Sequence, residues 1–261
     1  MSIEKYAVIG NPIEHSKSPL IHHAFASQFG KQISYEKVLA PLDGFTATVD
    51  RLRAEGYRGA NVTVPFKFKA LQYVVQHGRL RPLADTARAV NTLILNGQDI
   101  EGDNTDGVGL MRDIEKNASV TLKGKRVLII GAGGAAFGIL QPLVNAQPSN
   151  IVITNRTFSK AEEAATILAT LIKNAPVVTT IHALPMDILA GNKFDVLINS
   201  TSAGLTDTAL PIPNDIFGQD CLAYDMMYGR ETPFMHQARA AGAYVADGPG
   251  MLVEQAAEAF Y

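Results

Sequence analysis

The sequence predicts an α/β protein of two domains, and three observations support that class. Short apolar runs of strand length alternate with segments of helical period along the chain. This rhythm starts twice, at the N-terminus and again near residue 123, where an apolar strand runs into a glycine turn. The 261 residues are also enough for two domains of modest size.

The first series of elements fills the N-terminal part of the chain. Its alternation of strands and helices is typical of a mostly parallel sheet covered by helices. Strands are expected at 6–10, 34–39 and 60–64, and helices at 19–29, 44–55 and 67–77.

A hairpin is expected after this series. Residues 89–95 and 98–104 form its two strands, and Asn96-Gly97 between them suits the left-handed positions of a type I′ turn. The segment 105–117 then starts at a good N-cap residue and becomes helical. We expect it to connect the two domains.

The second series begins with the strand, glycine turn and helix of residues 123–144. The same strand–helix rhythm continues from there to the C-terminus. Further strands are expected at 150–155, 177–181, 194–200, 222–228 and 243–247, and helices at 159–172, after Thr232-Pro233, and from about 251 to the end.

Composition limits the classes of partner. The 23 Lys and Arg residues nearly balance 25 Asp and Glu, so no basic field would attract nucleic acid or an anionic membrane, and a small molecule is the expected ligand. The single cysteine, Cys221, has no metal-ligand spacing around it, which suits a protein in a reducing compartment. Its side chain is expected to be buried. No segment resembles a signal peptide or a membrane span. We expect a soluble, cytoplasmic protein without a metal.

The motif GAGGAA at residues 131–136 predicts a dinucleotide site. Gly131 allows a tight turn, Gly133 lets the backbone approach a pyrophosphate, and the small Ala136 lets the helix pack closely on the strand. The motif follows a strand and opens a helix, which is the context that it requires. A purely structural turn is the alternative.

The end of the next strand favours NADP over NAD. An NAD site would place an acid there to bond the ribose hydroxyls, but the sequence reads NRTFSK. Arg156, and with it Lys160, would bind the 2′-phosphate, while Asn155 and Thr157 would donate hydrogen bonds. A solvated basic loop is the alternative interpretation.

Two N-terminal loops carry further polar side chains. In NVTVPFK, Asn61 and Thr63 share one face of a strand, and Lys67 lies just past its carboxyl end, where open α/β sheets bind ligands. In NPIEHSKSP, Ser16 and Ser18 precede a helix. Their paired hydroxyls would bind a polyol or a carboxylate, although the local sequence favours a capping role.

The motif GDNTDG at residues 102–107 contains two acids, Asp103 and Asp106. Asp106 falls in the first turn of the expected connecting helix, where the helix dipole stabilises a carboxylate. Asp103 is suited to a turn. Spacing alone does not decide which of them meets Lys67.

Taken in order, GNPIEHSKSP, GANVTVPFK, AVNTL, GDNTDG, GAGGA, NRT, YDMMY and DGPGMLVEQAA resemble the motifs of the shikimate dehydrogenases. The resemblance implies reversible reduction of 3-dehydroshikimate to shikimate by NADP(H), a step of aromatic amino-acid biosynthesis. It implies an N-terminal α/β substrate domain of residues 1–105 and 247–261, a Rossmann-type NADP-binding domain of residues 106–246, and an active site in the cleft between them. A monomer or a homodimer is expected.

The resemblance also assigns the site residues. Lys67 and Asp106 would form the catalytic pair, in which Lys67 stabilises the charge on the substrate oxygen and supplies a proton. Substrate would contact Ser16, Ser18, Asn61, Thr63, Asn91, Tyr228 and Gln255, and the cofactor would contact Gly131, Ala132, Gly133, Gly134, Ala135, Asn155, Arg156, Thr157, Lys160, Met226 and Gly248.

Two alternatives stay open. A quinate/shikimate dehydrogenase would have broader substrate and cofactor choice, and Arg156 in place of an acid argues against it. A metabolite sensor would keep the fold without turnover, and the presence of both Lys67 and Asp106 argues against that.

Overall fold

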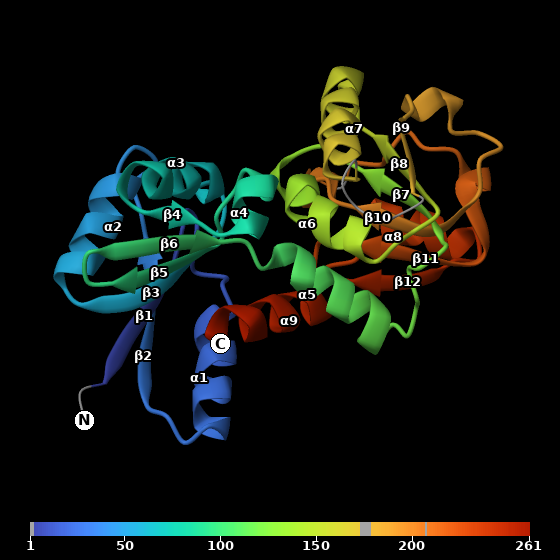
Figure 1. The fold of residues 1–261 in the computed structure, drawn as a ribbon. Helices are drawn as coiled ribbons and strands as arrows, with labels where there is room; N and C mark the ends of the chain where they lie inside the picture. Colours follow the sequence, from blue (N-terminus) through green and yellow to red (C-terminus); the bar gives the residue numbers. More distant parts are fainter. Residues whose placement is uncertain (1–2, 173–178, 207) are drawn as a thin grey trace. The chain divides into compact units, whose positions relative to one another are not determined.

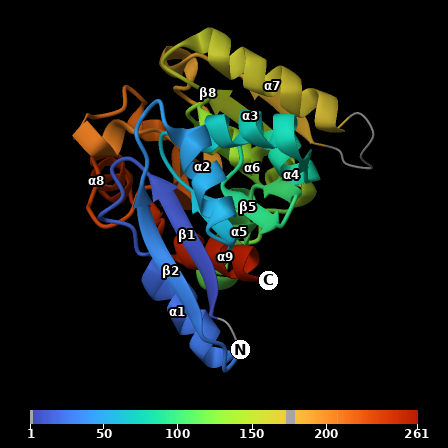
Figure 2. The ribbon, with the colours of Figure 1, turned by 90° about the vertical axis from the view of Figure 1, so that its left-hand side faces the viewer.

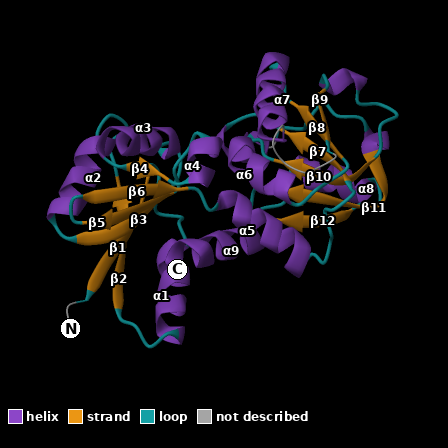
Figure 3. Ribbon diagram, in the orientation of Figure 1, coloured by secondary structure: helices purple, strands orange, loops and turns teal. Residues whose placement is uncertain are grey.

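The computed structural model describes residues 3–172, 179–206 and 208–261, which form two compact α/β units. The first unit runs to Asp106 and includes Val253–Tyr261, and the second comprises Gly107–Leu252. Each contains a six-stranded sheet with helices packed on it (Figures 1 and 3). The two-domain α/β class predicted from sequence is confirmed.

The C-terminal boundary between the units falls inside a helix, α9 (Pro249–Phe260). The sequence places that boundary at residue 247. The structure places it later because Met251, in the first turn of α9, is buried in the core of the second unit.

The sheet of the first unit has the strand order β2-β1-β3-β5-β6-β4. Strand β1 is parallel to both β2 and β3, and the β5–β6 hairpin joins antiparallel to β3. The elements of this unit are β1 (Glu4–Gly10), α1 (Ser18–Gln28), β2 (Ile33–Leu39), α2 (Phe45–Ala54), β3 (Tyr57–Val62), α3 (Lys67–His77), β4 (Arg79–Leu80), α4 (Pro82–Ala87), β5 (Thr92–Asn96) and β6 (Asp99–Asp103).

The apolar core of this unit lies between the sheet and helices α2 and α3. Phe45 and Leu52 of α2 pack with Val74 of α3 and Leu93 of β5, and all four are buried. Because successive side chains of β3 point to opposite faces of the sheet, Val62 faces this core while its neighbour Asn61 stays half-buried. Helix α1 packs beside β2 (Figure 2). The polar side chains of the strands therefore lie on the face away from α2 and α3.

The predicted hairpin is present, but its turn is shifted by one residue. Asn96 pairs with Asp99, so the turn residues are Gly97 and Gln98. Gly97 has a φ of 64°, and Asn96 is not left-handed. The type I′ turn at Asn96-Gly97 was therefore wrong, because Asn96 extends the strand instead of entering the turn.

The sheet of the second unit is entirely parallel, with the order β12-β11-β10-β7-β8-β9. Its elements are α5 (Asp106–Arg112, whose first residue belongs to the first unit), the π-helix η1 (Asp113–Asn117), β7 (Arg126–Ile130), α6 (Gly134–Asn145), β8 (Asn150–Thr154), α7 (Phe158–Ile172), β9 (Thr180–Ala183), η2 (Met186–Ile188), β10 (Phe194–Asn199), η3 (Ala203–Thr206), η4 (Asn214–Ile216), β11 (Phe217–Asp225), α8 (Pro233–Ala240) and β12 (Tyr244–Asp247).

Both faces of this second sheet are buried. Val127 and Ile129 of β7 belong to one core, which also contains buried residues of α6 and α7. Leu128 and Ile130 belong to the other, which includes residues of α8. This burial on two faces explains why RVLII reads as a continuous apolar run. The order of the strands reverses between β7 and β10, which is where such sheets bind ligands.

Other sequence expectations need adjustment. The short β4 and α4 were not predicted, and the expected helix 105–117 is an α-helix followed by one π-helical turn. The strand expected at 177–181 appears as β9 from Thr180, and residues 177–178 lie outside the described residues. Among the described residues, no helix has the length and apolar character needed to cross a membrane.

Candidate active site

Lys67 and Asp106 form a close ion pair in the first unit. Lys67 opens α3 just after β3, and its Nζ lies 2.6 Å from Oδ2 of Asp106, the first residue of α5. The Asp106 side chain is 9% exposed and that of Lys67 is 27% exposed. The carboxylate is therefore held in the protein interior, while the ammonium group remains accessible.

The choice between the two acids of GDNTDG is clear in the structure. Asp103 pairs with Arg81, whose Nη1 lies 3.3 Å from Asp103 Oδ2. Arg81 follows β4, which joins the edge of the sheet beside β6. Asp106, three residues later, is the acid that meets Lys67.

Asn91 connects the ion pair to the C-terminal helix. Its Nδ2 donates to Asp106 Oδ1 at 2.9 Å and to Thr105 Oγ1 at 3.0 Å. Gln255 of α9 approaches Thr105 and Asn91, because its Oε1 lies 3.2 Å from Thr105 Oγ1 and 3.4 Å from Asn91 Nδ2. Asn91 is 3% exposed. Oδ1 of Asp106 is thus fixed by a buried amide, and Oδ2 pairs with Lys67.

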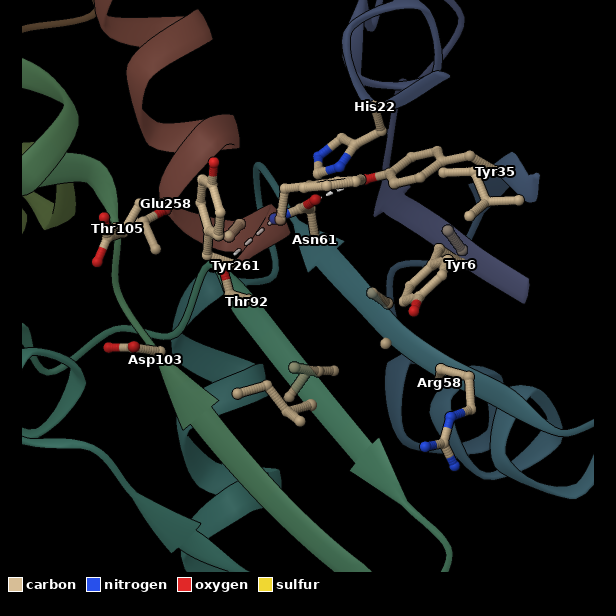
Figure 4. A pocket seen from close by; sticks show the side chains of 18 of the residues that line it. Tyr6, His22, Tyr35, Arg58, Asn61, Thr92, Asp103, Thr105, Glu258 and Tyr261 are labelled. Carbon is tan, nitrogen blue, oxygen red and sulfur yellow. Dashed lines mark hydrogen bonds between the residues drawn. The ribbon is translucent and has the colours of Figure 1, made fainter. Parts of the chain in front are cut away.

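Asn61 lies in a second cluster, on β3. Its Oδ1 accepts a hydrogen bond of 2.5 Å from the hydroxyl of Tyr35. Its Nδ2 makes longer contacts with Thr92 Oγ1 at 3.3 Å and with the backbone oxygen of Asn91 at 3.4 Å. Figure 4 shows the bonds from Asn61 to Tyr35 and to Thr92. Asn61 is therefore linked to Asn91, and through Asn91 to the ion pair.

The two serines of the first loop bond to each other. Ser16 Oγ lies 3.3 Å from Ser18 Oγ and accepts the backbone N–H of Ser18. Helix α1 starts at Ser18 itself, and the residue before it, Lys17, makes no side-chain cap bond. Ser18 is thus not the N-cap that the local sequence favours. Thr63 borders the same loop, since its Cγ2 lies 2.7 Å from where a Cβ on Gly10 would stand.

The arrangement in the first unit suits a polyhydroxylated substrate. It combines one ammonium group, one buried carboxylate, carboxamides and hydroxyls at the carboxyl ends of parallel strands. A cation that lies against a buried carboxylate can stabilise negative charge on a substrate oxygen and exchange a proton with it. Sequence reasoning missed Tyr35 and Thr105, because an aromatic residue in a strand and a helix-starting threonine carry no specific signal.

The glycine loop of the second unit has the geometry of a dinucleotide site. Gly131 has a φ of 116°, and a Cβ there would stand 2.5 Å from Ser200 Oγ, so a side chain would not fit. Gly133 and Gly134 are exposed, and a Cβ on either would meet nothing within 4 Å. Helix α6 starts at Gly134 without a side-chain cap. The first amides of that helix can therefore be approached by a phosphate.

The loop after β8 presents the basic residues expected for a 2′-phosphate. Arg156 and Lys160 are exposed. Asn155 Nδ2 donates to the backbone oxygen of Thr157 at 2.9 Å, which fixes the bend of the loop. The residues present thus fit a phosphorylated dinucleotide, and none of them is an acid that would repel the phosphate.

The remaining predicted residues of the second unit cluster after β11. The Met226 amide donates to Asn199 O at 3.0 Å, and a Cβ on Gly248 would stand 2.6 Å from Met226 O, so these two segments touch. Tyr228 is half-buried in the same unit, and burial raises its pKa above the ordinary value. The described part of the chain has no group of three or more His, Cys, Asp or Glu side chains placed to hold a metal ion.

Two features define the class of the protein as a two-domain, dinucleotide-dependent oxidoreductase. The second unit has a parallel sheet with a glycine turn at its switch point, and the first unit has a cation–carboxylate pair. Comparison with known proteins specifies the family. Residues 8–93 match the shikimate dehydrogenase substrate binding domain, and residues 113–206 match the shikimate / quinate 5-dehydrogenase domain.

The curated relatives agree over the full chain. The NADP(+) shikimate dehydrogenase of Methylobacillus flagellatus is 57% identical over 99% of this chain and 93% of its own length. The chain belongs to the shikimate dehydrogenase family.

Solved structures give the same result. An Ael1 enzyme from Pseudomonas putida has a TM-score of 0.90 at 44% identity, covering 98% of this chain and 92% of its own. Shikimate 5-dehydrogenase from Thermus thermophilus, in complex with NADP(H) and shikimate, has a TM-score of 0.84 at 30% identity. The match covers 99% of this chain and 92% of the Thermus chain.

Proposed function

We propose that Lys67 and Asp106 are the catalytic pair of an enzyme that interconverts 3-dehydroshikimate and shikimate with NADP(H). The observation that carries this assignment is the 2.6 Å ion pair between Lys67 and Asp106. The enzyme thereby takes part in aromatic amino-acid biosynthesis, as an oxidoreductase acting on a secondary alcohol.

In the direction of reduction, the substrate ketone carbon accepts a hydride and its oxygen becomes negative. NADPH, when bound, supplies that hydride. The ammonium group of Lys67 stabilises the charge on the oxygen and donates the proton that completes the hydroxyl. Asp106 keeps Lys67 in place, and Asn91 keeps Asp106 in place through its other oxygen. In the reverse direction Lys67 accepts the hydroxyl proton.

The substrate is held by groups that suit a carboxylate and several hydroxyls. Paired hydroxyls at the start of a helix are well placed to donate to a carboxylate. Carboxamides both donate and accept, as ring hydroxyls require. We assign substrate binding to Ser16, Ser18, Asn61, Thr63, Asn91, Gln255 and Tyr228.

The cofactor is held by the second unit. Backbone amides at the start of α6 receive the pyrophosphate, and the exposed guanidinium of Arg156 receives the 2′-phosphate. We assign cofactor binding to Gly131, Ala132, Gly133, Gly134, Ala135, Asn155, Arg156, Thr157, Lys160, Met226 and Gly248.

The proposal also covers the roles of the two units, the cellular location and the oligomeric state. We assign the substrate-binding and catalytic role to the unit that extends to Asp106 and includes Val253–Tyr261, and NADP binding to the unit Gly107–Leu252. The enzyme acts in the cytoplasm. It functions as a monomer or a homodimer, and its proposed catalytic pair lies within one chain.

An assay that follows the oxidation of NADPH by its absorbance tests the proposal. We expect turnover of 3-dehydroshikimate, and of shikimate with NADP in reverse. Quinate and NAD, tested in parallel, should give far lower kcat/KM. Equal use of quinate would indicate a quinate/shikimate dehydrogenase, and binding without turnover would indicate a sensor; either result would overturn the proposal.

A further inference from the structure

The amide of Asn61 has a fixed orientation. Its contact with the Asn91 backbone oxygen places Nδ2 on that side, because a carbonyl only accepts hydrogen bonds. Oδ1 must then face Tyr35, whose hydroxyl donates to it at 2.5 Å. The two Nδ2 contacts are longer, at 3.3 and 3.4 Å. The amide is thus anchored through its oxygen, and Nδ2 can be shared with a substrate hydroxyl.

Tyr35 lies between two groups assigned to substrate binding. Asn61 accepts its hydrogen bond on β3, and Ser18 of α1 interacts with the same phenol. Tyr35 is 7% exposed. Burial raises its pKa above the ordinary value, against the opposing effect of Ser18, so the phenol stays protonated and remains a donor. The Tyr35 hydroxyl therefore remains a donor that fixes the amide of Asn61 on β3.

The ring of His22 covers that phenol. The two rings stack with centroids 4.4 Å apart and an angle of 16° between their planes (Figure 4). Phe25 and Phe260 surround the imidazole at 6.3 and 6.1 Å. His22 is 4% exposed, and its Nε2 has no hydrogen-bond partner among the described residues. Burial lowers the pKa of His22 to about 4, partly offset by Asn61, so the ring is neutral near pH 7.

We propose that His22 and Tyr35 are a positioning pair, in which the flat face of His22 holds the Tyr35 hydroxyl against Asn61 and thereby sets the affinity for the substrate. The inference rests on the proposed function, because it deepens the role of Asn61. Neither residue touches the reacting atoms. Their effect is on the KM for the substrate, whereas the ion pair of Lys67 and Asp106 governs kcat.

The matched pair of variants is Tyr35→Phe and Tyr6→Phe. Tyr35→Phe removes one oxygen and keeps the ring that His22 stacks on. We expect a roughly 5- to 20-fold rise in the KM for shikimate, the scale of one hydrogen bond, with kcat and the KM for NADP within about twofold of wild type. Tyr6 lies on the neighbouring strand and bonds Glu4 at 3.1 Å. Tyr6→Phe should leave all three constants unchanged.

A second set tests how His22 acts. His22→Leu removes the flat ring and should raise the KM for shikimate by roughly the same factor as Tyr35→Phe, since both loosen one bond. His22→Phe keeps a flat ring and should restore most of the affinity. His23→Leu, an exposed neighbour on α1, is the control. The double variant His22→Leu/Tyr35→Phe should be little worse than either single variant.

The outcomes separate this inference from the proposed function. If wild-type enzyme does not oxidise shikimate with NADP, the proposed function fails. If it does so and Tyr35→Phe keeps the wild-type KM, the positioning pair alone is overturned. A loss of kcat or NADP affinity equal to the loss of shikimate affinity would also overturn it. So would a KM for His22→Phe as high as that of His22→Leu. Should His22→Leu fail to fold, Tyr35→Phe and His22→Phe still decide the matter.

Discussion

The region proposed to be catalytic in the first unit and the glycine loop proposed to bind the cofactor in the second differ in how their side chains are supported. Asp106 and Asn91 are buried and bonded to each other, and Asp106 also pairs with Lys67. In the cofactor region Gly133 and Arg156 are exposed. A group that acts on charge developing in a transition state must be in place beforehand, whereas a loop that binds a large anion can present backbone amides and a cation to solvent.

This difference implies different effects of substitution. Changes in the first region should alter kcat or substrate affinity, because they disturb a connected network. Changes in the second should alter cofactor affinity, because each contact is made directly with the ligand. The following experiments challenge that division, beginning with the largest expected effect.

Lys67→Ala should lower kcat by roughly 10²-fold or more, because it removes the group that stabilises the oxygen charge, and it should change the substrate KM little. Lys69→Ala, an exposed lysine on the same helix, is the control. Steady-state kinetics with shikimate and NADP measure both constants. A near-normal kcat with a large KM would make Lys67 a binding residue and remove the contrast between the regions.

Arg156→Ala should weaken NADP binding by roughly 2–3 kcal/mol, the scale of a charged hydrogen bond, and leave NAD nearly unaffected. The ratio of kcat/KM for the two cofactors reports the change, with the exposed Lys193→Ala as control. An unchanged ratio would show that the 2′-phosphate is recognised elsewhere, and Lys160→Ala would be the next variant. Adding Asn155→Asp should shift preference further towards NAD, because a carboxylate repels the phosphate.

The buried His22 should make the stability of the first unit sensitive to acid. Its pKa is lowered from 6.5 to about 4 by burial, so the folded state binds a proton less readily than the unfolded state. Its contribution to stability is complete above pH 6.5 and is lost as the pH falls towards 4. Between pH 7 and 5 we expect a loss of about 2 kcal/mol in the free energy of unfolding.

Urea unfolding of wild type and His22→Phe at both pH values measures this loss. The variant should show a smaller drop, whereas His23→Gln should behave like wild type. Three polar groups act on His22 or lie against it: Tyr35, Asn61 and the exposed His23. Glu258 of α9 lines a pocket together with His22, Tyr35 and Asn61. An equal drop in wild type and His22→Phe would show that other groups cause the acid sensitivity.

Two glycines of the cofactor loop should separate stability from binding. Gly131→Ala should lower stability by at least about 1 kcal/mol, because the residue has a φ of 116° and a Cβ would meet Ser200. Gly133→Ala should leave stability near wild type, since a Cβ there meets nothing, and should instead raise the KM for NADP. Thermal unfolding and kinetics distinguish them. A destabilised Gly133→Ala would mean that the loop is more tightly packed than the structure shows.

Sequence predicted most of the fold because its signals are local. The apolar run RVLII and the glycine turn after it each fix a backbone state over a few residues, and the Asn-Gly dipeptide marks a hairpin. Local reasoning also placed Lys67 at the carboxyl end of a strand and predicted the glycine loop, whereas the catalytic role of Lys67 came from the family resemblance. The shift of the hairpin turn to Gly97 shows its limit, because strand pairing and not dipeptide preference decided which residues turn.

The rest depended on contacts between distant segments. Local spacing does not separate Asp103 from Asp106, and only the resemblance assigned Asp106. The contact of Asp103 with Arg81 was not predictable, because Arg81 follows a strand of only two residues. Tyr35 reads as an ordinary strand aromatic until β2 and β3 are placed on either side of β1. Only then does its hydroxyl meet Asn61.

The central claim is that Lys67 and Asp106 work as one unit. A double-mutant cycle in kcat, with Lys67→Ala, Asp106→Ala and the double variant, tests it most directly. Residues that act as a unit are strongly non-additive, so the double variant should be about as slow as Lys67→Ala alone. Losses that multiply, so that the double variant falls by the product of the two single effects, would show that the residues act independently and would contradict the account.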